Sequence, residues 1–333
     1  MFDNIKSMPA KVCLGLSFFI GFLYSINFIF FSSCSVINGD GDCFSLIPNG
    51  AAPDHESYGR GAGTLYVAGA LMAGVIMGNL LILNEGAKGK WTIMIPTIAG
   101  FTSLAIVLAP PFQGDYESAN NNPLYATIVA LALYIAAYVM LKEEGVDEGL
   151  AFNMGIKLNN EAKYAVMLSS AIGGLYTINH LFFADGYAGA GGSTLLSGFD
   201  EGTYWTDPIA ATPLSIRVLG AFFVTYVSMG LILLTNGAKG NWPVAHILLF
   251  GVSFFSLSII IANFATIEQV IPGDANSPYT PDDSTDVTNS IVVGIVMALN
   301  IFAYYKMREE GVEEGMTFGG EDFGNSDDFF YKM

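Results

Sequence analysis

The chain has 333 residues, of which 52% are hydrophobic and only 13% are charged. Soluble domains usually carry about a quarter charged residues, so this composition excludes an ordinary soluble domain. The net charge of −17 disfavours nucleic acid as a partner.

Eight apolar windows follow one another along the chain. A helix needs about 20 mainly apolar residues to cross the hydrocarbon core of a bilayer, and each window is close to that length. Their bounds are 12–33, 63–83, 91–110, 123–141, 162–184, 213–235, 242–264 and 287–307. The first window is longer than the apolar part of a cleaved signal peptide, and its counterpart at 162–184 lies in mid-chain. We therefore expect the first window to be a retained helix.

Three motifs occur twice, in the same order in each half of the chain. The first copies lie at 21–27, 86–91 and 143–149, and the second copies lie at 173–179, 237–242 and 309–315. Each half holds four apolar windows, so both halves enter the membrane from the same side and form parallel repeats. The sequence therefore predicts an all-α polytopic integral membrane protein with eight transmembrane helices in two parallel four-helix repeats.

The repeat divides the chain into five expected segments. The two four-helix membrane repeats occupy residues 12–142 and 162–307, and an inner connector at 143–161 joins them. A short N-terminal segment, 1–11, and an acidic tail, 308–333, complete the chain, and we expect both on the cytoplasmic side.

Basic residues predict this orientation. If both termini are cytoplasmic, eleven of the 13 lysines and arginines lie inside, and only Arg60 and Arg217 lie outside. Such a bias is typical of multi-pass proteins. The 30 acidic residues divide evenly between the two sides, so the outer face is strongly acidic and should attract cations or basic partners.

Two cysteines share the first outer loop. Cys34 and Cys43 would form a disulfide if that side of the membrane is oxidising, and would stay free thiols in a reducing compartment. The sequence leaves both alternatives open.

A Tyr-Ser/Thr-Ile-Asn motif lies inside the first window of each half. Tyr24 and Asn27 are three residues apart and so share a helix face, as do Tyr176 and Asn179. Polar side chains in membrane helices usually hydrogen-bond to neighbouring helices. The alternative is a polar intramembrane site formed by all four side chains around the axis between the repeats.

Acidic clusters follow the last window of each half. Negative charge at the C-terminus of a helix opposes the helix dipole, so repetition of these clusters indicates a docking surface or a weak Ca²⁺ or Mg²⁺ site, and the alternative is a hydrated collar. The acidic residues are Glu143, Glu144, Asp147, Glu148, Glu309, Glu310, Glu313 and Glu314. The second motif, Gly-Ala-Lys-Gly-x-Trp at 86–91 and 237–242, predicts a tight turn followed by a tryptophan at the membrane interface.

Catalytic motifs are not recognisable in this sequence. Its three histidines, His55, His180 and His246, fall in different regions, and no nucleophile motif or dinucleotide fingerprint occurs. We therefore expect no enzyme activity, no cofactor and no resident metal. The charged residues in these windows lie near the window ends, and window cores without charge favour a structural or assembly subunit of a membrane complex, with protein partners or a second copy in the bilayer. The alternative is a passive channel for a small polar or cationic solute along the axis between the repeats.

Overall fold

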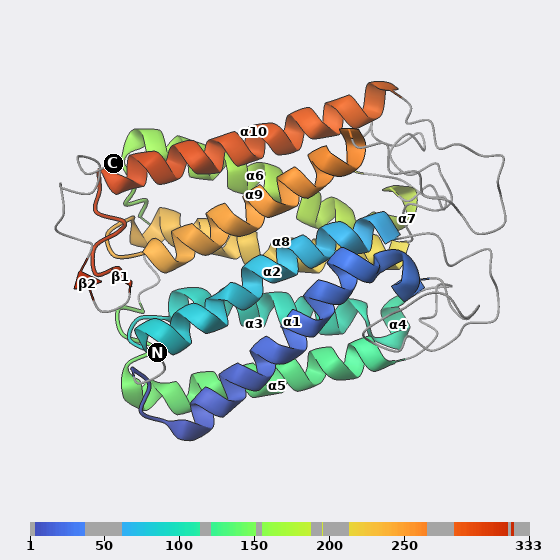
Figure 1. Cartoon of the computed structure of the whole chain (residues 1–333). Coiled ribbons are helices and arrows are strands. Elements are labelled where there is room, and N and C mark those ends of the chain that lie inside the picture. Colours follow the sequence, from blue (N-terminus) through green and yellow to red (C-terminus); the bar gives the residue numbers. More distant parts are fainter. Residues whose placement is uncertain are drawn as a thin grey trace.

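The computed structural model describes residues 4–36, 62–113, 121–150, 155–187, 195, 213–264, 283–318 and 321–322 (Figure 1). Within these residues the fold is helical, apart from a 3₁₀ turn, η2 (Lys142–Glu144), and two short antiparallel strands, β1 (Thr317–Phe318) and β2 (Glu321–Asp322). The helices are α1 (Met8–Val36), α2 (Ala62–Glu85), α3 (Trp91–Val107), α4 (Pro110–Gln113), α5 (Asn122–Leu141), α6 (Asn160–Phe182), α7 (Ala184–Tyr187), α8 (Pro213–Asn236), α9 (Trp242–Phe264) and α10 (Asp283–Arg308).

Seven of the described helices are long and apolar enough to cross a membrane: α1, α2, α5, α6, α8, α9 and α10. The remaining apolar window, expected at 91–110, forms the shorter helix α3 of 17 residues. It ends before the Pro110-Pro111 pair, because proline disfavours helical geometry in the residue that precedes it. At 1.5 Å per residue, α3 is about 25 Å long, slightly less than a hydrocarbon core of about 30 Å. The chain is thus a multi-pass membrane protein with seven candidate spans among its described residues.

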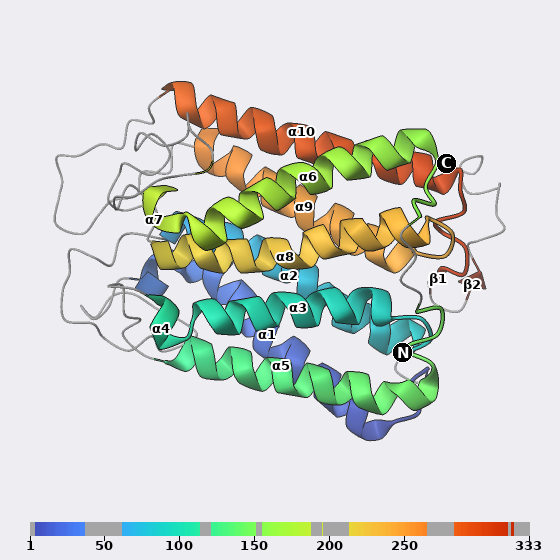
Figure 2. The ribbon, with the colours of Figure 1, turned by 180° about the vertical axis from the view of Figure 1, so that it is seen from behind.

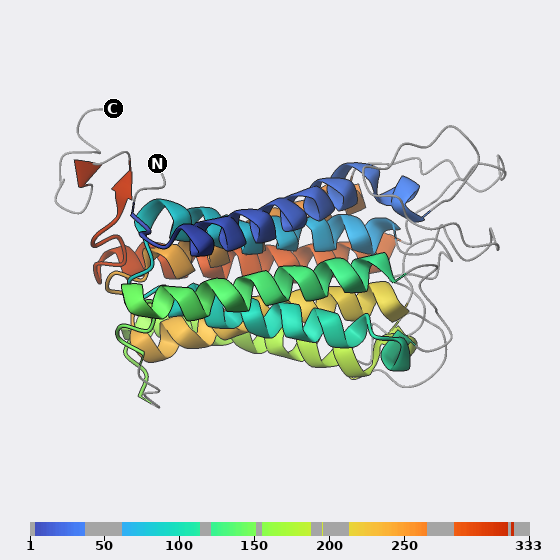
Figure 3. The same ribbon diagram turned by 90° about the horizontal axis from the view of Figure 1, so that it is seen from below.

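The long helices run side by side in one bundle, with α2, α3, α8 and α9 at its centre (Figures 1, 2 and 3). On the outside, α1 packs on α2 and α5, while α6 packs on α8 and α10. The central helices join the two halves of the chain, since α2 packs on α9 as well as on α1, and α3 packs mainly on α8. The central helices are also more deeply buried than the outer helices. Inside the bundle, 67% of the most apolar stretch of α2 or α8 is buried, against 28% for α1, α5 and α6 and 22% for α10.

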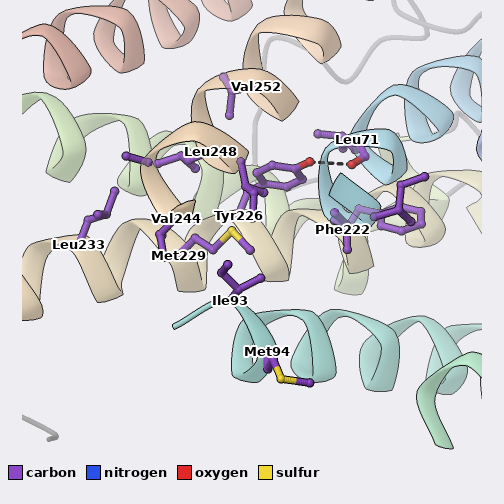
Figure 4. Packing of buried hydrophobic residues seen from close by; sticks show 14 of the residues in the cluster. Leu71, Ile93, Met94, Phe222, Tyr226, Met229, Leu233, Val244, Leu248 and Val252 are labelled. Carbon is purple, nitrogen blue, oxygen red and sulfur yellow. Dashed lines mark hydrogen bonds between the residues drawn. The ribbon is translucent and has the colours of Figure 1, made fainter. Parts of the chain in front are cut away.

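Glycines allow the central helices to approach closely. A Cβ atom placed on Gly74 of α2 would lie 2.7 Å from the Cα of Gly251 on α9 and 2.2 Å from the Tyr226 hydroxyl oxygen. Tyr226 enters this crossing from α8 and donates a hydrogen bond to the Leu71 carbonyl oxygen at 2.6 Å (Figure 4). The bundle centre is therefore filled by side chains of α2, α8 and α9.

Large apolar side chains cover the outside of the bundle. Phe30 on α1 and Phe182 on α6 are 71% and 73% exposed, and Tyr164 and Tyr305 are similarly open. Exposed tyrosines near helix ends are typical of the boundary between lipid and water. The outer helices thus present an apolar surface suited to a bilayer.

Candidate functional site

The acidic clusters lie at one end of the bundle, where they contact the starts of other helices. Glu144 follows α5, and its carboxylate accepts the backbone N–H groups of Lys6 at 2.8 Å and Ser7 at 2.7 Å. Ser7 also accepts the Ala10 N–H through its own hydroxyl, as an N-cap residue does. The Glu144 charge therefore lies at the positive end of α1, which accounts for an acid that is unfavourable at the end of its own helix.

The second cluster makes the corresponding contact at α6. Glu310, after α10, accepts the backbone N–H of Asn159 at 3.1 Å. The Asn159 side chain in turn accepts the Ala162 N–H at 2.9 Å and so caps α6. Each cluster thus joins the end of one outer helix to the beginning of another.

A tyrosine and a second acid reinforce each cluster. Tyr138 on α5 donates a hydrogen bond to Asp147, and Tyr304 on α10 donates one to Glu313 at 2.7 Å. The acids also form ion pairs with nearby bases, since Lys142 lies 3.4 Å from Asp147. These bonds hold the turns after α5 and α10 against their own helices.

The two turn motifs, which the sequence presents separately, lie in contact. The Gly89 N–H donates to the Gly145 carbonyl at 2.9 Å, and the Gly240 N–H donates to the Gly311 carbonyl at 3.0 Å. All four glycines have positive φ angles, a conformation that is strained for other residues. The Gly-Ala-Lys-Gly-x-Trp turn of each half is therefore attached to its acidic turn.

Ion pairs complete the contact between the turns. Lys88 lies 3.0 Å from Glu148, and Lys239 lies 3.2 Å from Glu314. These pairs are exposed and contribute little stability by themselves. Sequence reasoning missed the association of the two motifs. Their joint duplication was the signal that could have suggested it.

The remaining acids of the clusters face outward. Glu309 lies 3.3 Å from Lys306, and Glu143 is exposed in the η2 turn. Within the described parts of the chain, no group of three or more His, Cys, Asp or Glu side chains is placed to hold a metal ion.

Lys90, the last residue before α3, joins the two halves at this end of the bundle. Its Nζ atom lies 5.7 Å from the centre of the Trp242 ring, which begins α9. Burial lowers the pKa of Lys90, and the nearby charge of Glu85 opposes part of that effect. The ammonium group is thus held against an aromatic face of the other half.

The paired Tyr and Asn residues lie on two separate outer helices, Tyr24 and Asn27 on α1 and Tyr176 and Asn179 on α6. Asn27 and Asn179 are 1% and 0% exposed, and the Asn179 side chain accepts the N–H of Leu195 at 3.0 Å. The structure therefore brings each tyrosine onto the helix of its own asparagine but does not gather the four side chains into one central cluster.

His246 makes a polar contact with Tyr304 that sequence reasoning missed. Its Nε2 atom lies 2.6 Å from the Tyr304 hydroxyl oxygen, so α9 is connected through Tyr304 to Glu313. The sequence contained no local signal for this chain of bonds, because His246 and Tyr304 are 58 residues apart.

The expected cysteine pair falls outside the described structure. Cys43 and the side chain of Cys34 are not among the described residues, as is also true of most of the acidic outer loops. Cys13, on α1, is a free thiol.

No family model matches the chain, and no curated protein or solved structure matches it. Function is therefore inferred from the geometry of this chain alone.

Proposed function

We propose that this chain is a non-catalytic structural or assembly subunit of a membrane complex. In this proposal α3 is an eighth span, the helices form two parallel four-helix repeats, and both termini lie on the cytoplasmic side. The outer helices bind lipid and protein partners. At the cytoplasmic end, the acidic turns join the last helix of each repeat to the start of its first helix.

The filled centre of the bundle is the observation that carries the proposal. Tyr226 occupies the crossing of Gly74 and Gly251, and a Cβ on Gly100 of α3 would lie 1.9 Å from the Thr225 hydroxyl oxygen of α8. A solute path along the axis between the halves would need to pass these contacts. Close packing by small residues is instead how membrane helices associate stably.

Matching contacts in the two halves support the duplicated architecture. Glu144 and Glu310 each bind the start of an outer helix. Lys88 and Lys239 each form an ion pair with an acid of the acidic turn in the same half. Equivalent contacts at equivalent sequence positions are expected of a repeat, whereas unrelated helices would differ.

Buried asparagines also favour a structural role. Asn27 and Asn179 are 1% and 0% exposed within the bundle. Polar side chains in this setting bind helices together with about 0.6–2 kcal/mol each.

Purification from native membrane in a mild detergent tests the proposal. Native mass spectrometry should detect a stoichiometric complex with at least one other membrane protein. A monomer without partners, together with solute flux in liposomes, would instead favour the passive channel.

A double variant separates the two functions. Asn27→Leu with Asn179→Leu should leave liposome permeability to small polar and cationic solutes at the background level of protein-free vesicles, as for the unmodified protein. Flux through the unmodified protein that disappears in the folded double variant would contradict the structural proposal.

A further inference from the structure

Among the buried polar side chains in the first half of the chain are four that lie away from the contacts described above. Ser17 on α1 and Tyr134 on α5 are 0% exposed, and Asn79 on α2 and Thr97 on α3 are 1% exposed. We call these residues the inner polar cluster. Each comes from a different one of the four long helices of this half.

Helix register places the four residues at a similar depth. Asn79 lies six residues before the end of α2, Thr97 six residues after the start of α3, Tyr134 seven before the end of α5 and Ser17 nine after the start of α1. At 1.5 Å per residue, all lie about 9–14 Å from the same end of the bundle.

Helix contacts bring the members of the cluster together. The Asn79 Nδ2 group donates to the Leu14 carbonyl oxygen of α1 at 3.4 Å, one turn from Ser17. The helix that carries Ser17, α1, packs both on the helix of Asn79 and on the helix of Tyr134. Thr97 lies close to the Tyr134 phenol, but the two hydroxyls do not meet in hydrogen-bond geometry.

Three polar atoms of this cluster have no hydrogen-bond partner among the described residues: Ser17 Oγ, Asn79 Oδ1 and Tyr134 Oη. Thr97 is different, because its hydroxyl donates to the Ile93 carbonyl at 2.9 Å. Buried polar groups are nearly always hydrogen-bonded to protein or to ordered water. The three atoms come from α1 and from the two helices that pack on it, an arrangement that would let one small partner reach all of them.

The second half satisfies the corresponding positions by itself. At the repeat offsets, Ser17 and Tyr134 correspond to Ser169 and Asn300. Their side chains hydrogen-bond directly, with 2.7 Å between Asn300 Nδ2 and Ser169 Oγ. Asn79 and Thr97 correspond to Gly230 and Leu248, which carry no polar side-chain atom. This comparison rests on the proposed duplication, whereas the three unsatisfied atoms of the first half do not.

We propose that the inner polar cluster binds water inside the first repeat. A water molecule typically makes about three hydrogen bonds in a buried site, which matches the three available atoms. It would donate to Asn79 Oδ1, which only accepts, and exchange donor and acceptor roles with the two hydroxyls. All four side chains are neutral, so the site suits a neutral ligand and disfavours an ion, which would need a counter-charge at this depth.

Radiolytic hydroxyl labelling of the intact protein in detergent tests the proposal, because radicals formed from a bound water react with the side chain beside it. Tyr134 should be labelled several-fold faster than Tyr226, although both are buried. Tyr226 is the matched control, since its hydroxyl already donates to Leu71. Equal labelling of Tyr134 and Tyr226 would overturn the proposal.

Thermal unfolding gives an independent test through the sign of a shift. If Tyr134 binds water, Tyr134→Phe removes a satisfied bond and should lower the unfolding temperature by about 2 °C or more. If its hydroxyl is buried without a partner, the same change removes an unfavourable group, and an unchanged or higher unfolding temperature would refute the site. Ser17→Ala provides a smaller second variant, for which the same signs apply.

Discussion

Replacing Glu144 with alanine should loosen the beginning of α1. Its carboxylate accepts two backbone N–H groups, those of Lys6 and Ser7, at 2.8 and 2.7 Å. These bonds are partly exposed, so they should resemble helix-capping contacts more than fully buried charged bonds. Loss of both contacts should therefore cost about 1–2 kcal/mol of local stability, and Glu144→Gln, which keeps one acceptor, should cost roughly half.

Amide hydrogen exchange measured by mass spectrometry reports this local stability. A loss of one or two kcal/mol should speed exchange in peptides covering the first turns of α1 by about 5–30-fold. Peptides from the start of α6 should keep their rates. Glu310→Ala should give the converse result, with faster exchange at α6 and no change at α1.

Glu143→Ala is the matched control, because Glu143 is the exposed neighbour of Glu144. It should leave exchange at α1 unchanged. Equal rates in the Glu143 and Glu144 variants would refute the capping role. A uniform increase across both halves would also refute it, since it would mean that the whole fold, not one helix end, had been weakened.

Three further outcomes follow from the central helices. Tyr226→Phe removes the buried bond to Leu71 and should lower the free energy of unfolding by about 1 kcal/mol in a denaturant titration. Gly251→Ala should reduce the folded yield on size-exclusion chromatography, because its Cβ would lie 2.1 Å from the Tyr226 hydroxyl oxygen, whereas Gly174→Ala, with open space around it, should not. Because burial lowers the pKa of Lys90 below its ordinary value of 10.5, its ammonium form destabilises the fold, and stability should rise as the pH approaches 10.5. Lys90→Met should reduce that rise in thermal unfolding, and an identical pH profile would contradict the assignment.

Hydropathy predicted most of the long helices because their apolar windows are nearly continuous. It overestimated the length of α3, whose helix ends before Pro110. It also left the rotation of each helix undetermined. A helix such as α2, which is apolar on nearly all sides, shows no periodicity that separates its lipid-facing side from the side that carries Gly74.

Long-range pairings were beyond the sequence for a different reason. Glu144 is chemically suited to many partners, and its contact with Ser7 spans 137 residues. Local patterns predict turns and caps, but they do not specify which turn meets which cap. The paired motifs therefore indicated a repeat, but they did not reveal that its acids bind the starts of α1 and α6.

The long span between these contacting residues imposes an order on biosynthesis. Synthesis of the chain reaches Ser7 long before Glu144, and at about 5–20 residues per second the delay over 137 residues is roughly 7–27 s. During that interval the start of the first helix lacks the Glu144 carboxylate that binds the Lys6 and Ser7 N–H groups. The start of the first helix in each half is thus capped by a carboxylate only after the last helix of that half has been made.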